Sequence, residues 1–452
     1  MVVADGDAGA AAGGHLLGRV VDRPGAAQRR RLAADATPGD VHRRSLLAQH
    51  ERDALAAAAA RSGDERDLPR RRRSVTRPTI ASSAMAVGFQ PPAIGDEEIE
   101  AVAETIRSGW LTTGPRAADL EARFAEYLDA KHVLAVASGT AALHLSLAAL
   151  GVGPGDEVIT TPITWPATAN VIVHLGAVPV FADVRNDDLN IDPAHAASLV
   201  GERTRALLPV HLAGQPADLE PLWALGLPVV EDAAHAVESA YRDRKIGALS
   251  EATCFSLYAT KNVAAGEGGL IATNREDVAA GVADLRVTRR GDGRRYDVPV
   301  PGYKANLPDV LAAIALVQLT KVEGHRAIRL AQFAAYDEAV AELDGLDALR
   351  RDPRDTHAYH LYIVRVDPER AGASRDEYQR ALSEEGISTS IHFLPVHRLT
   401  WYRQRFPEQP ALPVAERAGE EVLSLPLSPA HSEADIEAVI AALRRVHARF
   451  VG

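Results

Sequence analysis

The chain has 452 residues, a formal net charge of −11, 46% hydrophobic and 25% charged residues. This composition is typical of a globular protein with room for two domains, and the acidic balance argues against nucleic acid as a partner. A single cysteine excludes an internal disulfide framework, and no apolar run approaches the ~20 residues of a membrane helix. The first residues lack a secretory signal, so we expect a cytoplasmic protein without a membrane partner.

Residues 1–84 are rich in alanine and arginine and show no sustained periodicity. This composition predicts a solvated, disordered extension. From residue 85 the sequence changes to a proline-containing lead-in followed by a helix. We expect Asp96 to cap that helix and Ala101, Val102 and Ile106 to form its apolar face.

Short apolar segments alternate with helical segments after residue 116. Strands are predicted at 132–137, 157–161, 178–183, 205–210, 228–231, 252–257 and 268–273. Helices are predicted at about 140–150, 166–176, 193–200 and 216–225. Several of the strands are almost entirely apolar, as in strands buried on both faces. The alternation predicts an α/β domain over 85–310, with a mostly parallel sheet flanked by helices.

The last part of the chain has a different pattern. A long helix is predicted from about residue 310 to residue 343. It is followed by possible strands at 359–366 and 387–393 and by a helix near 375–385. These elements predict a smaller α+β domain over 311–452.

The first motif with possible chemistry is Ser138-Gly139-Thr140, directly after the strand at 132–137. Small residues let the backbone approach an anion, and the free N–H groups of a helix N-terminus attract phosphate. Taken alone, the motif is explained more simply by a plain helix cap at Ser138 or Thr140, and both interpretations stay open.

Two further motifs follow in the sheet region. Trp165, in PITWPATAN, is an aromatic residue in the loop after a strand. Glu231 and Asp232 end the strand at 228–231, where a carboxylate could pair with a protonated ring nitrogen or cap a helix in AAHAVESA. His235 lies one helical turn after Asp232 and would face the same side.

Lys261 differs in position from the other four lysines of the chain. It follows the strand at 252–257 and precedes the glycine-rich AAGEGG, so it lies at the carboxyl end of a buried strand. A desolvated lysine has a lowered pKa and can form a Schiff base. Together with a phosphate loop, an acid and an aromatic residue, it provides what a phosphate-bearing aromatic aldehyde needs.

The ordered strings SGWLTTGP, ASGTAALHL, GDEVITTPITWPATAN, VVEDAAHAV, SLYATKNVAAGEGG, GYKANLPDVLAAIALVQL and HFLPVH give the chain a family resemblance. It resembles the DegT/DnrJ/StrS-type sugar aminotransferases, a branch of the fold-type I pyridoxal-phosphate enzymes, from about residue 85 to near the C-terminus. Among these relatives, the wording is most similar to the UDP-4-amino-4-deoxy-L-arabinose aminotransferases.

The resemblance implies a role for each matching residue. Lys261 matches the Schiff-base lysine and Asp232 the partner of the pyridine nitrogen, while His235 lies beside the ring. Trp165 matches the aromatic residue that stacks on the ring. Gly139, Thr140 and Ser256 match phosphate contacts. Asn306 matches a phosphate ligand donated by the neighbouring subunit, which implies a homodimer with shared sites. No metal is expected.

Substrate contacts are less specific. The resemblance makes Lys304 a candidate for a substrate phosphate contact, although a surface charge is equally plausible, and Trp110, Thr112 and Thr113 are candidates for lining the sugar site. His392 and His397, in HFLPVH, are candidates for the substrate phosphates or are ordinary loop histidines. The loop TRRGDG near 288–292 departs from the family's usual histidine, which leaves the sugar open.

The implied reaction transfers an amino group from L-glutamate to a keto sugar nucleotide. Pyridoxal phosphate and pyridoxamine phosphate would alternate in a ping-pong mechanism. The 4-keto sugar is expected to be UDP- or dTDP-linked. A cyclitol aminotransferase would share this machinery, and a non-catalytic cofactor-binding regulator is a further alternative. A pyridoxal-phosphate sugar dehydratase is disfavoured, because that branch has histidine where this chain has Lys261.

Overall fold

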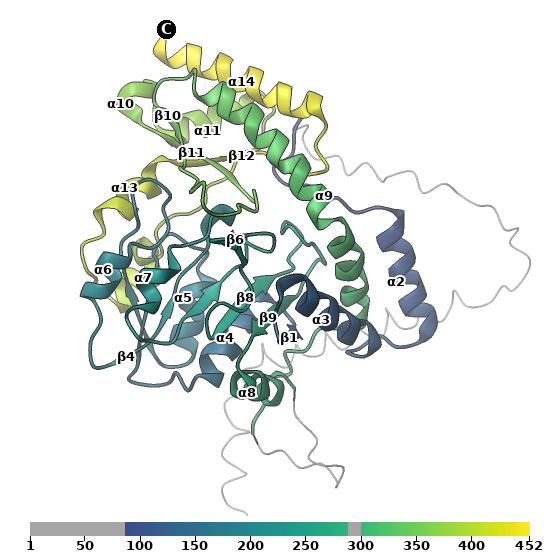
Figure 1. Ribbon diagram of the computed structural model, residues 1–452. Helices are drawn as coiled ribbons and strands as arrows, with labels where there is room; N and C mark the ends of the chain where they lie inside the picture. The colour runs from purple at the N-terminus through teal and green to yellow at the C-terminus, as the bar shows by residue number, and fades with distance from the viewer. Residues whose placement is uncertain (1–85, 288–299) are drawn as a thin grey trace, which may run out of the picture. The chain divides into compact units, whose positions relative to one another are not determined.

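The computed structural model describes residues 86–287 and 300–452 (Figure 1). The predicted extension at 1–84 and the loop near 288–292 lie outside these residues. The larger helices are α2 (Asp96–Ser108), α3 (Pro115–Leu128), α4 (Gly139–Ala149), α5 (Ala167–His174), α8 (Glu276–Arg286), α9 (Asp309–Val340), α11 (Arg375–Glu384), α13 (Pro413–Glu421) and α14 (Glu433–Val451). The shorter ones are α6 (Pro193–Ser198), η1 (Leu212–Gly214), α7 (Leu219–Trp223), α10 (Pro368–Ala371), η2 (Val396–Arg398) and α12 (Thr400–Arg405).

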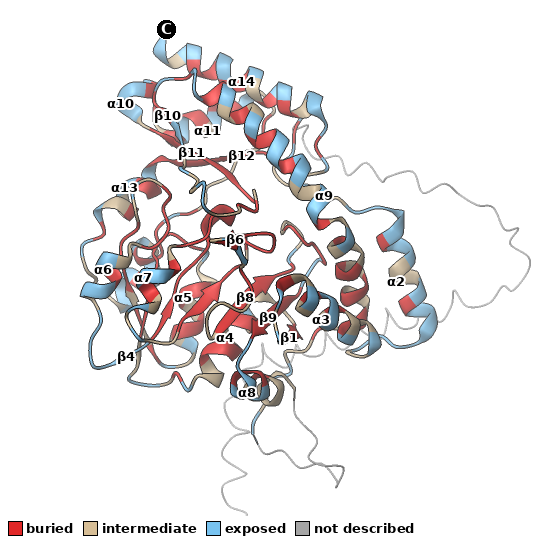
Figure 2. Cartoon of the chain, viewed as in Figure 1, coloured by how far each residue is buried: buried red, intermediate tan, exposed pale blue. Residues whose placement is uncertain are grey.

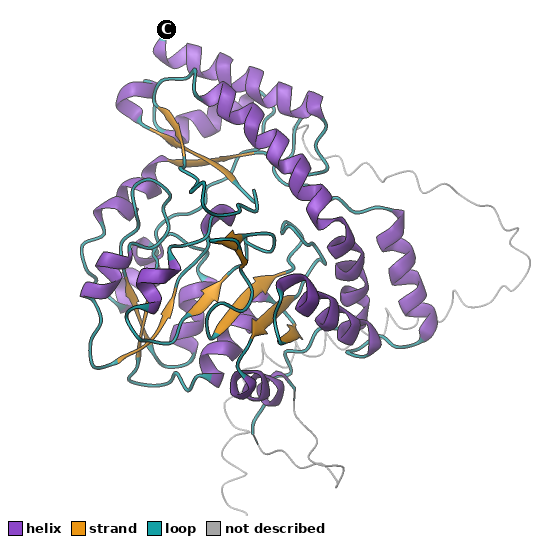
Figure 3. Ribbon diagram, in the orientation of Figure 1, coloured by secondary structure: helices purple, strands orange, loops and turns teal. Residues whose placement is uncertain are grey.

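All seven strands predicted before residue 300 are present, each within a few residues of its expected bounds (Figure 3). They are β1 (His132–Val136), β2 (Glu157–Thr160), β3 (Val178–Phe181), β4 (Thr204–Leu208), β5 (Val230–Asp232), β8 (Ala252–Ser256) and β9 (Gly269–Thr273). A short hairpin of β6 (Ala240–Tyr241) and β7 (Arg244–Lys245) was not predicted.

The seven strands lie in the order β3-β2-β4-β5-β8-β9-β1. Strands β3, β2 and β4 pair in parallel, and single parallel bridges connect β4 to β5. Strand β8 is parallel to β5, and β9 is antiparallel to both of its neighbours, β8 and β1. Among these seven strands only β9 runs against the others, so the predicted mostly parallel sheet is confirmed.

Helices cover both faces of this sheet, which explains its apolar strands (Figure 2). In β1, Val133 and Ala135 pack against α3 and α9, while Leu134 and Val136 pack against α4. Successive side chains of a strand point to opposite faces, so a strand buried on both sides is apolar throughout. The layered arrangement leaves the ends of the strands as the place for polar chemistry.

The start of α2 differs from the sequence prediction. Gly95, not Asp96, is the N-cap residue, and the carboxylate of Glu98 accepts its N–H at 2.8 Å. Ile106, predicted on the apolar face, is 56% exposed, while Thr105 is buried. Ala101 and Val102 are half-buried on the same side as Thr105, so of the three predicted residues only Ile106 faces away from the packed side.

A second sheet is antiparallel and consists of β10 (Leu346–Ala348), β11 (Tyr362–Val366) and β12 (Val422–Leu425). Residues 333–340 of α9 enter its core, whereas residues 312–322 enter the core beside the large sheet. Figure 1 shows α9 running from beside α2 and α3 toward α14. The described residues belong to one compact unit, so the division at residue 310 stays a prediction.

The strand predicted at 387–393 is wrong. This segment forms only single bridges, from Ile387 to Val87 and from Ser390 to Ser424. It is apolar because Ile387 and Phe393 fill two different hydrophobic clusters. Within the described chain, no helix is long and apolar enough to cross a membrane.

Candidate active site

A cavity of about 580 Å³ lies where loops leave the carboxyl ends of β1, β2, β5 and β8. In open α/β sheets this edge is where ligands bind. The loops after the four strands form one side, and residues 89–90 and 390–393 form another. The predicted site residues that line the cavity are Gly139, Thr140, Trp165, Asp232, His235, Ser256, Lys261 and His392.

Lys261 comes from the turn after β8, in which its backbone N–H donates to the carbonyl of Tyr258 at 2.8 Å. None of the described residues accepts a hydrogen bond from its ammonium group. Burial lowers the pKa of Lys261 to about 8, and the charge of Asp232 opposes this shift. A lysine in this state has a substantial neutral fraction near physiological pH, as a nucleophile or base requires.

Asp232 ends β5 and is 5% exposed. Thr168 donates its hydroxyl to Oδ2 at 2.8 Å, and the Ala234 N–H donates to Oδ1 at 3.1 Å. Burial raises the pKa of this carboxyl group, while these two donors lower it. The segment after Asp232 forms turns rather than the predicted helix, so the alternative role as a helix cap is wrong.

The neighbouring Glu231 has a separate structural role. It is fully buried and accepts hydrogen bonds from His211 Nε2 at 2.9 Å and from the Thr253 hydroxyl at 3.2 Å. The Ala217 N–H donates to His211 Nδ1, so the proton of the neutral ring lies on Nε2 and points to Glu231. Of the two adjacent acids, only Asp232 lines the cavity.

His235 is held as a neutral ring. The Ala213 N–H donates to its Nδ1 at 3.3 Å, which leaves the ring proton on Nε2. Burial and the nearby Lys261 charge lower its pKa well below the ordinary value. Its ring centroid lies 4.3 Å from that of His360 and 6.1 Å from that of Phe393.

The N-terminus of α4 forms the opposite end of the site. Ser138 caps the helix by accepting the Ala141 N–H at 3.0 Å, as one of the two open interpretations expected. The first N–H groups of a helix have no partner within the helix and favour an anion. A Cβ atom at Gly139 would lie 3.0 Å from Cβ of Ser256, so a larger residue there would push these two closely packed segments apart by a few tenths of an ångström.

Trp165 forms part of the cavity wall and is 65% exposed. An aromatic wall, a buried carboxylate, a lysine with a lowered pKa and a helix N-terminus match the ring, the ring nitrogen, the aldehyde and the phosphate of pyridoxal phosphate. The residues of the cavity therefore fit this cofactor. The volume of the cavity is larger than that of the cofactor alone, which leaves room for a substrate.

Five predicted residues form a second cluster outside the cavity. Lys304 donates to Asn306, which donates to the hydroxyl of Thr113. The indole N–H of Trp110 donates to the Thr113 carbonyl at 3.2 Å, and the carbonyl of Thr112 accepts the N–H of Asp309. None of these five lines the cavity of its own chain.

The two predicted loop histidines are separated. His392 lines the cavity with Nδ1 2.8 Å from the Ser424 hydroxyl, and burial lowers its pKa to about 4. His397 is buried elsewhere, with Nε2 3.2 Å from Glu416, and does not line the cavity. The geometry thus favours a structural role for His397.

Several cavity residues were not identified from the sequence. Thr168 lies three residues after Trp165, a helical spacing that would have indicated a shared side. His360, Phe393 and Gln90 reach the cavity from distant segments, so only the tertiary fold brings them to it. No local sequence pattern marks them.

A mostly parallel sheet with this set of residues at its carboxyl edge defines a pyridoxal-phosphate enzyme of fold type I. The sequence model of the DegT/DnrJ/EryC1/StrS aminotransferase family matches residues 92–444, and the chain belongs to this family. The predicted fold class, enzyme class and cofactor are thereby confirmed. The enzyme is a pyridoxal-phosphate-dependent sugar aminotransferase.

Known proteins support this assignment. The spore coat polysaccharide biosynthesis protein SpsC of Bacillus subtilis strain 168 is 43% identical over 375 residues, 79% of this chain and 96% of SpsC. The pyridoxal-phosphate form of Spr1654 from Streptococcus pneumoniae is 30% identical with a TM-score of 0.77, covering 81% of this chain and all of Spr1654. DesI, solved in the presence of its TDP-sugar product, is 32% identical with a TM-score of 0.74, covering 80% of this chain and 93% of DesI.

Proposed function

We propose that this enzyme transfers the amino group of L-glutamate to the keto group of a nucleotide-linked 4-keto sugar, carried by UDP or dTDP. The observation that carries the proposal is the convergence of Lys261, Asp232 and His235 on one cavity with room beyond the cofactor. The similarity to DesI, which was solved with a TDP-sugar product, supports a nucleotide sugar as the acceptor.

Lys261 is proposed to hold the cofactor covalently and then to move the proton of the amino donor. Pyridoxal phosphate, when bound, supplies an electrophilic carbon and a ring that accepts the electron pair of the donor's Cα–H bond. The neutral Nζ of Lys261 would take the proton from the donor Cα as a general base and, as a general acid, deliver it to the carbon that was the aldehyde carbon of the cofactor. Its pKa of about 8 makes both protonation states accessible.

Asp232 and His235 are proposed to hold the ring from two directions. Asp232 accepts the N–H of the protonated ring nitrogen, and its bonds from Thr168 and Ala234 fix the orientation of the carboxylate. Because the His235 ring is neutral, its Nε2–H would donate a hydrogen bond to the phenolic oxygen of the cofactor ring without adding a positive charge. Gly139, Thr140 and Ser256 are proposed to bind the phosphate. Trp165 lines the same cavity and is proposed to cover one face of the ring.

The amino donor and the sugar are proposed to use the same cavity in turn, which gives ping-pong kinetics. His392 lines the cavity and is proposed to contact the phosphates of the sugar nucleotide. Lys304 and Asn306, outside the cavity of their own chain, are proposed to complete the site of the second subunit of a cytoplasmic homodimer. Trp110, Thr112 and Thr113 stay candidates for the sugar site in that assembly.

A substrate screen tests the proposal. The purified enzyme is incubated with L-glutamate and a panel of UDP- and dTDP-linked 4-keto sugars, and release of 2-oxoglutarate is measured. Turnover with one of these sugars and parallel lines in double-reciprocal plots are expected. Turnover with a keto cyclitol alone would contradict the sugar-nucleotide proposal, and the absence of any half-reaction with L-glutamate would contradict the donor.

A further inference from the structure

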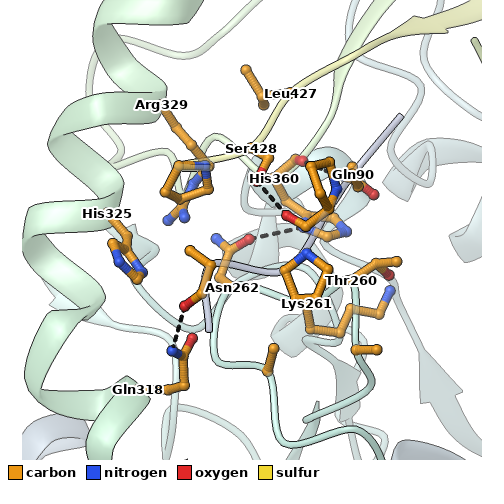
Figure 4. A pocket seen from close by; sticks show the side chains of 16 residues that line it. Gln90, Thr260, Lys261, Asn262, Gln318, His325, Arg329, His360, Leu427 and Ser428 are labelled. Atoms are coloured by element: carbon orange, nitrogen blue, oxygen red, sulfur yellow. Dashed lines mark hydrogen bonds between the residues drawn. The ribbon is translucent and has the colours of Figure 1, made fainter. Parts of the chain in front are cut away.

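A small second cavity of about 30 Å³ also borders Lys261, and Asn262, Gln318 and Arg329 line it (Figure 4). Beside it lies a buried ion pair, in which Arg329 of α9 donates to the carboxylate of Glu238. Arg329 is 3% exposed and Glu238 1% exposed. The pair connects α9 to the segment that follows His235.

The hydrogen bonds of this pair have a fixed direction. An ionised carboxylate can only accept, so Asn262 must point its Nδ2 at Glu238, at 2.7 Å. The same Nδ2 donates to the carbonyl of Ala358 at 3.1 Å. The amide oxygen of Asn262 therefore faces Nδ1 of His360 at 2.8 Å, and this nitrogen must carry the ring proton (Figure 4).

His360 connects these hydrogen bonds to the active site. Its ring lies against the ring of His235, and its backbone N–H donates to the carbonyl of Ala213 at 3.0 Å. The N–H of Ala213 in turn donates to Nδ1 of His235. Both histidines line the large cavity, and Asn262 directly follows Lys261. Hydrogen bonds thus connect this network to His235, and the peptide bond to Asn262 connects it to Lys261. These are two of the residues proposed to act at the cofactor.

We propose that Glu238, Asn262 and His360 are positioning residues: the carboxylate of Glu238 orients Asn262, which fixes the tautomer of His360 and the turn that carries Lys261. This inference rests on the role proposed for Lys261. A buried ion pair adds little net stability, because desolvation offsets the attraction between its charges. Burial raises the pKa of Glu238, and the charge of Arg329 and the bond from Asn262 oppose this rise, so Arg329 favours the carboxylate form that only accepts hydrogen bonds.

The test uses two variants that leave the Arg329–Glu238 pair intact. Asn262→Ala removes the bonds to Glu238 and His360. His360→Phe keeps a ring beside His235 but removes the donor to Asn262. In cofactor-free protein, the rate at which cyanate modifies Lys261 is measured against pH by peptide mass spectrometry. Loosening the turn admits water to the ammonium group, so we expect the midpoint to rise by at least about 0.5 pH unit in both variants.

Gln318→Ala is the matched control. Gln318 lines the same small cavity, but it donates to the Ala93 carbonyl and to Glu98 rather than to the Asn262 network. This variant should lose thermal stability without moving the Lys261 midpoint. In the loaded enzyme, Asn262→Ala and His360→Phe should each lower kcat about tenfold with KM within about twofold, and their effects should not add in the double variant.

Unchanged midpoints in both variants, or additive losses of kcat, would overturn the positioning role. A fall in thermal stability alone would do the same, because it would show a merely structural network. The cyanate measurement contains no cofactor, so it decides the positioning role even if borohydride reduction shows that another lysine holds the cofactor. That second result would overturn the proposed function instead.

Discussion

Glu231 and Asp232 are adjacent acids with different environments, because successive residues of a strand point to opposite faces. Glu231 is enclosed by His211 and Thr253 within the sheet, whereas Asp232 reaches the cavity beside Thr168. The chemical type of the two residues is the same, so their roles follow from the register of β5. The sequence predicted both acids at the strand end, and only the family resemblance indicated that Asp232 is the partner of the ring nitrogen.

Replacing these two acids should separate their roles. Asp232→Asn removes the carboxylate proposed to hold a protonated ring nitrogen, and we expect kcat to fall about 100-fold or more with little change in stability. Glu231→Gln disturbs the buried hydrogen bond from His211, so the free energy of unfolding should fall by roughly 1–3 kcal/mol. Steady-state kinetics and urea unfolding measure the two effects. The reverse pattern would contradict the assignment of Asp232.

The lowered pKa of Lys261 predicts how cofactor capture depends on pH. Only the neutral amine adds to an aldehyde, so the capture rate of cofactor-free protein should rise about tenfold per pH unit below pH 8 and level off above it. An ordinary lysine, with a pKa near 10.4, would still gain rate at pH 10. Stopped-flow absorbance measures the rate, and Lys131→Ala serves as the surface-lysine control.

At the scale of elements, α4 and β8 approach each other closely at the proposed phosphate end of the site. In Gly139→Ala, the added Cβ would lie 3.0 Å from Ser256, so the helix N-terminus must shift away from it. We expect cofactor affinity to fall about tenfold or more, measured by fluorescence titration. Gly153→Ala is the control, because a Cβ there meets nothing within 4 Å. Equal affinity in the two variants would contradict a phosphate site at this helix.

The elements of the large sheet could be predicted because both of its faces are buried, which makes each strand a short apolar run. The same reasoning failed at 387–393, where the apolar residues Ile387 and Phe393 fill separate clusters and form no ladder. At α2 it predicted the helix and the half-buried Ala101 and Val102, but it misplaced Ile106, which is exposed. An apolar run therefore predicts a strand where neighbouring strands pair with it, and not where its residues fill clusters with only single bridges.

The candidate site was predictable where its residues follow strands in sequence, as Asp232 and Lys261 do. The contribution of His360 depends on a contact between distant segments, the bond from its Nδ1 to the amide oxygen of Asn262 across 98 residues. Such partners have no local signal. Lys304 and Asn306 were predicted only through the family resemblance. Their cluster lies outside the cavity of their own chain, so the sequence pattern alone does not connect them to a site.

At the scale of the whole molecule, α9 connects the two sheets and carries Arg329 to the segment behind the active site. Its residues 312–322 pack beside the large sheet, and residues 333–340 pack in the core of the small one. A shift of this helix would therefore change both the small sheet and the Glu238–Asn262 contact. The same helix begins at Asp309, directly after the segment with Asn306, so it also borders the proposed subunit contact.

Mixed dimers test whether two subunits share each site. If Asn306 of one subunit serves the cavity of the other, a dimer of Lys261→Ala with Asn306→Ala has one site with both defects and one intact site. Dimers isolated with two different affinity tags should then regain about half the specific activity of the parent enzyme, although each variant alone is nearly inactive.

Pairing Lys261→Ala with Asp232→Asn provides the control for this experiment. Both residues line the cavity of the same chain, so every site in that mixed dimer carries one defect and activity should stay low. Equal recovery in the two mixed dimers would show that reassociation, not complementation, restores activity. If the mixed dimer of Lys261→Ala with Asn306→Ala also stays inactive, the Asn306 cluster acts within its own subunit, through the bonds of Asn306 to Lys304 and Thr113.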